Sequence, residues 1–163
     1  ILGRIHPAKG TADAIDIARR AGRRLKIAGP IQDQSYFAEQ VAPAIDDHQV
    51  CYLGSVGPGQ RAELLASTAA LLHPIAFAEP FGLSVVESMA AGTPVVAYNR
   101  GSMPEIIDEG VTGFLVSGVQ SAAAAVEAAI ELDRGKVRSV AEGRFSADRM
   151  VDDYLALYGA VLR

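Results

Sequence analysis

Residues 73–87, HPIAFAEPFGLSVVE, predict the end of a strand, a loop and the first turns of a helix. The apolar run 68–73 is short and ends at a proline, which is typical of a buried strand that stops there. After Gly82, apolar residues recur with helical spacing. Glu79 is therefore expected in the loop, and Glu87 about one turn inside the helix.

The start of this helix could bind a phosphate, because free backbone N–H groups and the positive end of the helix dipole attract anions. The N–H groups that would face such a ligand belong to Phe81, Gly82, Leu83 and Ser84. The two carboxylates can only accept hydrogen bonds, so they suit ligand hydroxyls. A diphosphate between two polyols, as in a nucleotide-sugar, fits this arrangement.

A purely structural role is open for both acids. Ser84-x-x-Glu87 matches a capping box, in which the glutamate bonds the backbone of the N-cap residue. Glu79 could equally be a solvated loop residue. The rest of the chain has to decide between these alternatives.

The chain has 163 residues, 50% of them hydrophobic, which is enough for one domain with a sizeable core. Its net charge is −4 and it has no basic run, which argues against nucleic acid as the main partner. The single cysteine, Cys51, cannot form an internal disulfide, and no segment resembles a signal peptide or a membrane span. These features predict a reducing, cytoplasmic setting. The first residues are an apolar run without an initiator methionine, so we expect the chain to be part of a longer polypeptide.

Short apolar runs alternate with helical patterns along the chain. Strands are predicted over residues 1–5, 25–29, 49–54, 68–73, 94–98 and 113–116. Helices are predicted over residues 11–21, 35–41, 60–67, 83–91, 121–132, 137–143 and 147–162. This alternation predicts an α/β fold with a Rossmann-like, doubly wound parallel sheet of about six strands and helices on both faces. Ligands bind such sheets at the carboxyl ends of the strands, so the glycine-bearing loops should share one rim.

Arg4 and Lys9 follow the first predicted strand in one loop. An arginine can clamp a phosphate through two hydrogen bonds and a lysine adds a point charge, so the pair could complete a diphosphate site opposite the helix start. The alternative is a pair of solvated surface cations, which is the usual situation of these residue types.

Four other positions near the predicted rim have less specific signals. Gly29 and Leu53 lie at the ends of the second and third strands and could present backbone groups to a nucleobase, or only turn the chain. His73 is expected to be a structural histidine with satisfied hydrogen bonds. Ser102-x-x-Glu105 is expected to be a capping box. The histidines and the cysteine lack metal-ligand spacing, so no metal site is predicted.

The run EPFGLSVVESMAAGTPVVAYNRGSMPEIIDEGVTGFLV (79–116) resembles the C-terminal domain of family 4 glycosyltransferases, which have the two-domain GT-B fold. Glu79 and Glu87 meet the family's E-x7-E spacing. The segments GRIHPAKG, LKIAG and YLG appear in the family's order, and FSADRMVDDYLALY is similar to its closing helix. The resemblance covers essentially the whole chain.

The family implies a retaining, metal-independent transfer of a hexose from a nucleotide diphosphate sugar to an acceptor hydroxyl. A UDP-sugar is the expected donor, ahead of GDP- and ADP-sugars, and no cofactor is implied. By resemblance, the catalytic residues would be Arg4, Lys9 and Glu79, with the cations on the diphosphate and the acid on the sugar hydroxyls. The residues that bind the donor would be Gly3, Gly29, Leu53, Phe81, Gly82, Leu83 and Glu87. The last of these would accept hydrogen bonds from the ribose.

In the family, an N-terminal domain binds the acceptor, and that domain is not present in residues 1–163. We therefore expect this chain to be the donor-binding half of an enzyme, inactive alone, whose parent has no membrane span but could associate peripherally with a membrane. Two alternatives are a nucleotide-sugar epimerase domain of the same fold and a non-catalytic nucleotide-sugar binding module. The nucleobase, the sugar and the acceptor are left open.

Overall fold

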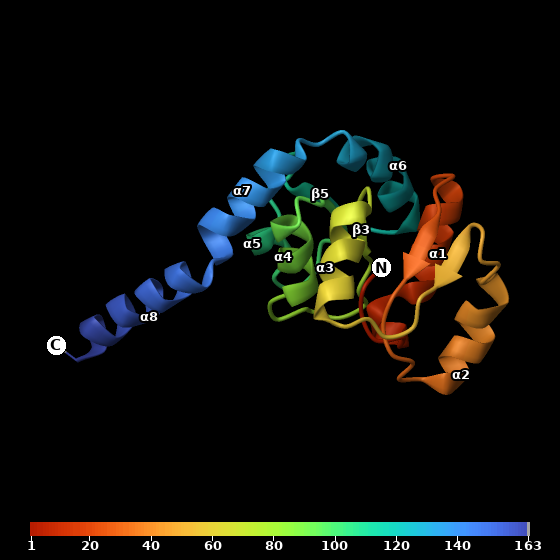
Figure 1. Ribbon diagram of the computed structural model, residues 1–163, viewed down its shortest axis with the longest axis horizontal. Coiled ribbons are helices and arrows are strands. Elements are labelled where there is room, and N and C mark those ends of the chain that lie inside the picture. The colour runs from red at the N-terminus through yellow and green to blue at the C-terminus, as the bar shows by residue number, and fades with distance from the viewer. Residues whose placement is uncertain (163) are drawn as a thin grey trace.

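In the computed structural model, which describes residues 1–162, short strands alternate with helices (Figure 1). The strands are β1 (Leu25–Ile27), β2 (Val50–Tyr52), β3 (Leu71–His73), β4 (Val95–Tyr98) and β5 (Gly113–Val116). The α-helices are α1 (Thr11–Arg20), α2 (Gln34–Tyr36), α3 (Pro58–Ser67), α4 (Leu83–Ala90), α5 (Met103–Ile106), α6 (Val119–Ile130), α7 (Arg134–Phe145) and α8 (Ala147–Val161). Three further helical turns are η1 (Pro7–Lys9), η2 (Phe37–Val41) and η3 (Ala42–Ala44).

All strand pairs are parallel, as the alternation of strands and helices predicts. β1 pairs with β2, and a second sheet has the order β3-β4-β5. In the second sheet Leu71 lies opposite Val95, and Val95 lies opposite Gly113. The carboxyl ends of these strands therefore point to the same side, where the loops of interest begin.

The predicted α/β architecture is confirmed, but the described residues form five strands in two sheets rather than about six in one. The missing strand is residues 1–5, which form only isolated bridges, from Leu2 to Ala28 and from Ile5 to Ile31, just beyond β1. Gly3 and Gly29 explain the interruption: a Cβ at Gly29 would lie 1.9 Å from the carbonyl oxygen of Gly3, so the two backbones touch there. Both glycines have positive φ values, 152° and 145°, which bend the chain out of a regular ladder.

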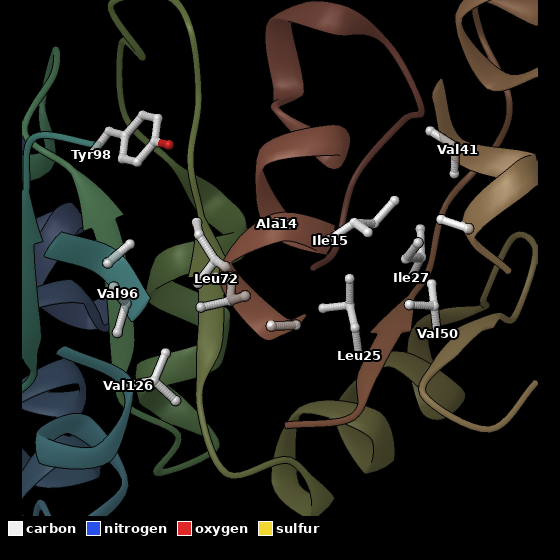
Figure 2. Close-up of a cluster of buried hydrophobic side chains, with 14 of the residues drawn as sticks. Ala14, Ile15, Leu25, Ile27, Val41, Val50, Leu72, Val96, Tyr98 and Val126 are labelled. Carbon is white, nitrogen blue, oxygen red and sulfur yellow. The ribbon is translucent and has the colours of Figure 1, made fainter. Parts of the chain in front are cut away.

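Helices cover both faces of the second sheet, because successive side chains of a strand point to opposite sides. Leu72, Val96 and Tyr98 belong to a buried cluster with α1 and α6, part of which Figure 2 shows. Leu71 and Val95 belong to a second cluster with α4, α5 and α7. This double covering is the expected doubly wound arrangement.

Two helices differ from their predicted form. The helix predicted over residues 35–41 is divided into α2 and the π-helical η2, and the chain continues past Pro43 as the 3-10 turn η3. A proline is tolerated there because it occupies the first turn of the new segment. The last helix, α8, extends away from the rest of the molecule (Figure 1). Within residues 1–162, no helix combines the length and the apolar composition needed to cross a bilayer.

Candidate functional site

The loops at the carboxyl ends of the strands form a cleft of about 470 Å³ with the first turn of α4. Six of the residues predicted to bind the donor line it: Gly3, Arg4, Lys9, Gly29, Leu83 and Glu87. They come from segments far apart in the sequence, and the parallel topology brings them together. The predicted common rim therefore exists as one cleft.

The N-terminus of α4 forms one wall of this cleft. Gly82 is the N-cap residue, and its φ of 90° lies in the left-handed region. A Cβ at this position would lie 2.6 Å from Cε of the buried Met103, so a side chain would be both strained and crowded. Since no side chain within residues 1–162 caps this end of the helix, its first N–H groups are available to an anion.

The capping-box alternative for Glu87 is wrong. Helix α4 begins two residues earlier than that alternative requires, with Gly82 rather than Ser84 as N-cap. The carboxylate of Glu87 instead lies 3.4 Å from the guanidinium of Arg61, with both side chains about 40% exposed. Ser84 and Glu87 both line the cleft and remain accessible to a ligand.

Lys9 and Glu79 form an ion pair of 2.8 Å between Nζ and Oε2, and their side chains are only 19% and 13% exposed. The ammonium of Lys9 also lies 4.6 Å from the ring centroid of Phe77. The pair therefore holds the lysine at the cleft in a fixed position. Glu79 is not a freely solvated loop residue, since its carboxylate is largely covered.

Arg4 is exposed, and it takes part in none of the ion pairs found within residues 1–162. Arg4 lines the cleft together with Lys9. The backbone of Gly3, the residue before Arg4, contacts the backbone of the buried Gly29. Backbone atoms therefore form this part of the cleft floor. A guanidinium without an internal carboxylate partner can bind a phosphate without first breaking a salt bridge.

Four predicted residues are not among those that line this cleft: Glu79, which pairs with Lys9, Gly82, which caps α4, Leu53 and Phe81. Leu53 is 44% exposed and lines an adjacent hollow, which shares Ser55 and Val56 with the cleft. Phe81 is also 44% exposed and packs edge to face on Phe145 at 6.2 Å. Its ring faces a groove between α4 and α8 rather than the cleft, although its backbone adjoins the helix start.

Arg61 is a cleft residue that sequence reasoning missed. It lies on α3 and reaches the cleft beside Glu87. A lone arginine on the polar face of a helix has no pattern that separates it from a solvated surface residue. Only the packing of α3 beside α4 brings its side chain to the site.

His73, at the end of β3, is buried, but its Nε2 has no hydrogen-bond partner within residues 1–162. The expectation of a satisfied structural histidine is therefore wrong. Burial, and to a smaller extent the charge of Lys9, lowers the pKa of His73 to about 4, against the opposing effect of Glu79. The imidazole is therefore neutral at neutral pH.

Ser102 is the N-cap residue of α5, but its side chain does not cap that helix. Its hydroxyl instead donates a hydrogen bond of 2.8 Å to the carbonyl of Phe81. The predicted capping box with Glu105 is therefore wrong, because the backbone of the neighbouring loop takes the hydroxyl. Within the described residues, no group of three or more His, Cys, Asp or Glu side chains could hold a metal ion.

Comparison with known families gives this geometry a context. Residues 1–142 match the family described as glycosyl transferases group 1. The chain belongs to the group 1 glycosyl transferases. The resemblance to family 4 glycosyltransferases inferred from the motifs is thus confirmed.

Two relatives within the group 1 glycosyl transferases are named D-inositol 3-phosphate glycosyltransferase. The protein of Segniliparus rotundus is 32% identical over 177 residues, which covers 99% of this chain and 39% of the relative. The protein of Mycobacterium bovis is 33% identical over 176 residues, which covers 96% and 36%. The chain therefore spans less than half the length of these relatives.

Two solved structures of similar fold superpose on most of this chain. A glycosyltransferase involved in avilamycin A biosynthesis superposes with a TM-score of 0.85 at 29% identity, over 99% of this chain and 51% of that one. Anabaena HepE, solved in complex with UDP-glucose, superposes with a TM-score of 0.80 at 24% identity, over 98% and 48%. The second likeness supports the fold alone.

Proposed function

We propose that this chain is the donor-binding half of a retaining glycosyltransferase, which moves a hexose from a UDP-sugar to an acceptor hydroxyl. The observation that carries the proposal is the cleft in which Arg4, Lys9 and Glu87 meet the first turn of α4. Two cations and a helix N-terminus suit a diphosphate, and carboxylates on either side suit a sugar and a ribose.

In this proposal the diphosphate lies between the Arg4 guanidinium and the first N–H groups of α4. The bond between the sugar carbon and the diphosphate oxygen breaks as the acceptor oxygen bonds to that carbon, and the proton of the acceptor hydroxyl leaves with the diphosphate. Arg4 and Lys9 stabilise the negative charge that develops on the diphosphate oxygen. Glu79 accepts hydrogen bonds from the sugar hydroxyls while it holds Lys9 in place. Glu87 accepts from the ribose, with Arg61 beside it.

Two lines of support favour a UDP-sugar donor and a glycosyl transfer. The family and both named relatives are glycosyltransferases. HepE, whose fold this chain shares, was solved with UDP-glucose. The transferred sugar and the acceptor are not specified by the residues of the cleft. We expect the reaction to need no metal and to take place in the cytoplasm.

We further propose that a second domain supplies the acceptor site and the opposite wall of the cleft. Several large apolar side chains of α8 are each more than half exposed, among them Leu155, Leu157, Tyr158 and Val161. A single domain rarely leaves such a row of large apolar residues in water, so a partner surface is expected to cover it. The relatives, more than twice the matched length, have room for such a domain.

A calorimetric titration of the 163-residue chain with UDP-, GDP- and ADP-glucose tests the proposal. We expect weak binding, tightest for the UDP-sugar, because one cleft wall is missing. Replacing Arg4 by Ala should weaken binding roughly 10- to 150-fold, the loss expected for a charge-assisted hydrogen bond. Arg138→Ala, on the exposed face of α7, is the matched control and should leave the affinity unchanged. Equal affinity of wild type and Arg4→Ala would exclude the phosphate role of Arg4.

A further inference from the structure

We infer that Ser102 is a positioning residue for the donor site: it joins the turn after β4 to the loop that holds Glu79 and the start of α4. The inference rests on the proposed function, because it assigns Ser102 a role in binding the sugar part of a nucleotide-sugar. Ser102 does not line the cleft and is not expected to touch the donor. Its role would be exerted through the backbone of residues 79–82.

Ser102 makes two hydrogen bonds to this loop. Its backbone N–H donates to the carbonyl of Glu79 at 2.9 Å, and its hydroxyl donates to the carbonyl of Phe81 at 2.8 Å. The residue between these two carbonyls is Pro80, which has no N–H to form a turn of its own. One residue therefore fixes the backbone on both sides of the proline.

The residues next to Ser102 contact the same loop. Gly101 has a φ of 57°, and a Cβ there would lie 2.3 Å from the backbone nitrogen of Glu79. The side chain of the fully buried Met103 lies beneath Gly82. Three consecutive residues thus meet the loop at Glu79, Phe81 and Gly82, and only a glycine permits the closest approach.

This contact connects the ligand-binding loop to the rigid part of the fold. The turn begins directly after β4, the central strand of its sheet, whose Tyr98 is buried. The loop itself has no regular secondary structure between β3 and α4. The position of the Glu79 carboxylate therefore depends on the bonds from Ser102 to the loop. Geometry that is off by a fraction of an ångström weakens a charged hydrogen bond to a ligand.

A merely structural role makes a different prediction. Loss of the hydroxyl leaves the exposed Phe81 carbonyl to water, so the melting temperature should fall only slightly. A positioning role should instead appear in the ratio of affinities for UDP-glucose and UDP. The sugar contacts depend on Glu79, whereas free UDP mainly uses the phosphate and ribose contacts.

The experiment compares wild type with Ser102→Ala, Ser102→Thr and Ser88→Ala, by calorimetry with UDP-glucose and UDP and by thermal melting. Ser88 is the matched control, because its hydroxyl also bonds a backbone carbonyl, that of Thr93 at 3.0 Å, toward the far end of α4. We expect Ser102→Ala to lower the affinity for UDP-glucose roughly five- to tenfold and that for UDP less than twofold. Ser102→Thr, which keeps the hydroxyl, should restore the ratio, and Ser88→Ala should lower only the melting temperature.

Amide hydrogen exchange over residues 79–84 separates the contact between the two loops from its effect on donor binding. Faster exchange in Ser102→Ala together with a changed affinity ratio supports the inference. If the wild type binds neither UDP-glucose nor UDP, the proposed function is refuted, and with it the role of Ser102 in donor binding. Faster exchange in Ser102→Ala would then still show that the two loops are in contact. Unchanged exchange and an unchanged ratio in Ser102→Ala would overturn the positioning role itself.

Discussion

The ion pair between Lys9 and Glu79 leads to a prediction that neither residue gives alone. Glu79→Gln keeps the shape of the side chain and an acceptor oxygen but removes the charge that partners Lys9. The distance from Nζ to Oε2 is 2.8 Å, and both side chains are less than one-fifth exposed. The degree of burial of this ion pair is therefore intermediate between that of a surface salt bridge and that of a fully buried one. Loss of the pair should cost about 1–3 kcal/mol of stability, or a fall of about 2–12 °C in melting temperature for a chain of this size.

The same substitution should strengthen the binding of free UDP. A phosphate oxygen bound on the far side of Lys9 Nζ would lie about 6 Å from the Glu79 carboxylate, the span of two charge-assisted hydrogen bonds. Removing the repulsion between these anions is worth about 0.7–2.8 kcal/mol for effective dielectric constants of roughly 80 to 20, or roughly 3- to 100-fold in affinity. UDP-glucose should gain less than UDP, because the acceptor for its hydroxyls is weakened.

Calorimetry with UDP and UDP-glucose on wild type and Glu79→Gln, with thermal melts of both, measures these effects. Glu142→Gln is the matched control, since Glu142 pairs with Arg138 at the same distance of 2.8 Å but with both side chains more than half exposed. It should change the melting temperature by no more than about 1–2 °C and should leave the affinities for UDP and UDP-glucose unchanged. If Glu79→Gln bound UDP no more tightly than wild type does, Lys9 would not face the diphosphate.

Three further predictions concern other residues. Glu87→Gln should weaken the binding of UDP and of UDP-glucose alike, roughly 10-fold or more, with little change in melting temperature because Glu87 does not cap α4. An unchanged affinity would exclude the role of Glu87 in binding the ribose. Wild type should lose stability as the pH falls from about 6.5 to about 4, because only the unfolded imidazole of His73 takes up a proton in that range, and His73→Leu should abolish this loss. Identical pH profiles of the two proteins in chemical denaturation would show that His73 is not buried in its neutral form. Gly82→Ala should lower the melting temperature by about 2–8 °C, because it adds a Cβ against Met103 to a residue in the left-handed conformation. Gly143→Ala, in open space on α7, should not lower it, and equal melting temperatures of the two variants would contradict the tight turn at Gly82.

Helices and most strands of this fold could be predicted from local patterns. β5 begins and ends at the predicted residues, and α8 differs by a single residue, because strand residues bounded by turn signals and a long helical stripe are strong local signals. The segment 1–5 could not be predicted in the same way. Its apolar residues resemble a strand, but the contact between the backbones of Gly3 and Gly29 is made across 25 residues and leaves only two bridges.

The candidate site could be predicted where residue type and loop position were enough. Glycines, cations and acids at the carboxyl ends of parallel strands must meet at one rim, and five of those predicted line the cleft, together with Leu83. Arg61 could not be found, because its role depends on how α3 packs against α4. The structural alternatives also failed for a tertiary reason: the hydroxyl of Ser102 and the carboxylate of Glu87 have partners on other elements rather than within their own helices.

We propose that the cleft at the start of α4 binds a nucleoside diphosphate sugar. Titrating the ¹⁵N-labelled chain with UDP-glucose, followed by amide chemical shifts, tests it most directly. We predict saturable shifts concentrated at residues 3–4, 9, 29 and 82–87, which line or adjoin the cleft. No shifts up to millimolar ligand, or shifts confined to the groove between α4 and α8 around Phe145 and Tyr154, would contradict the account.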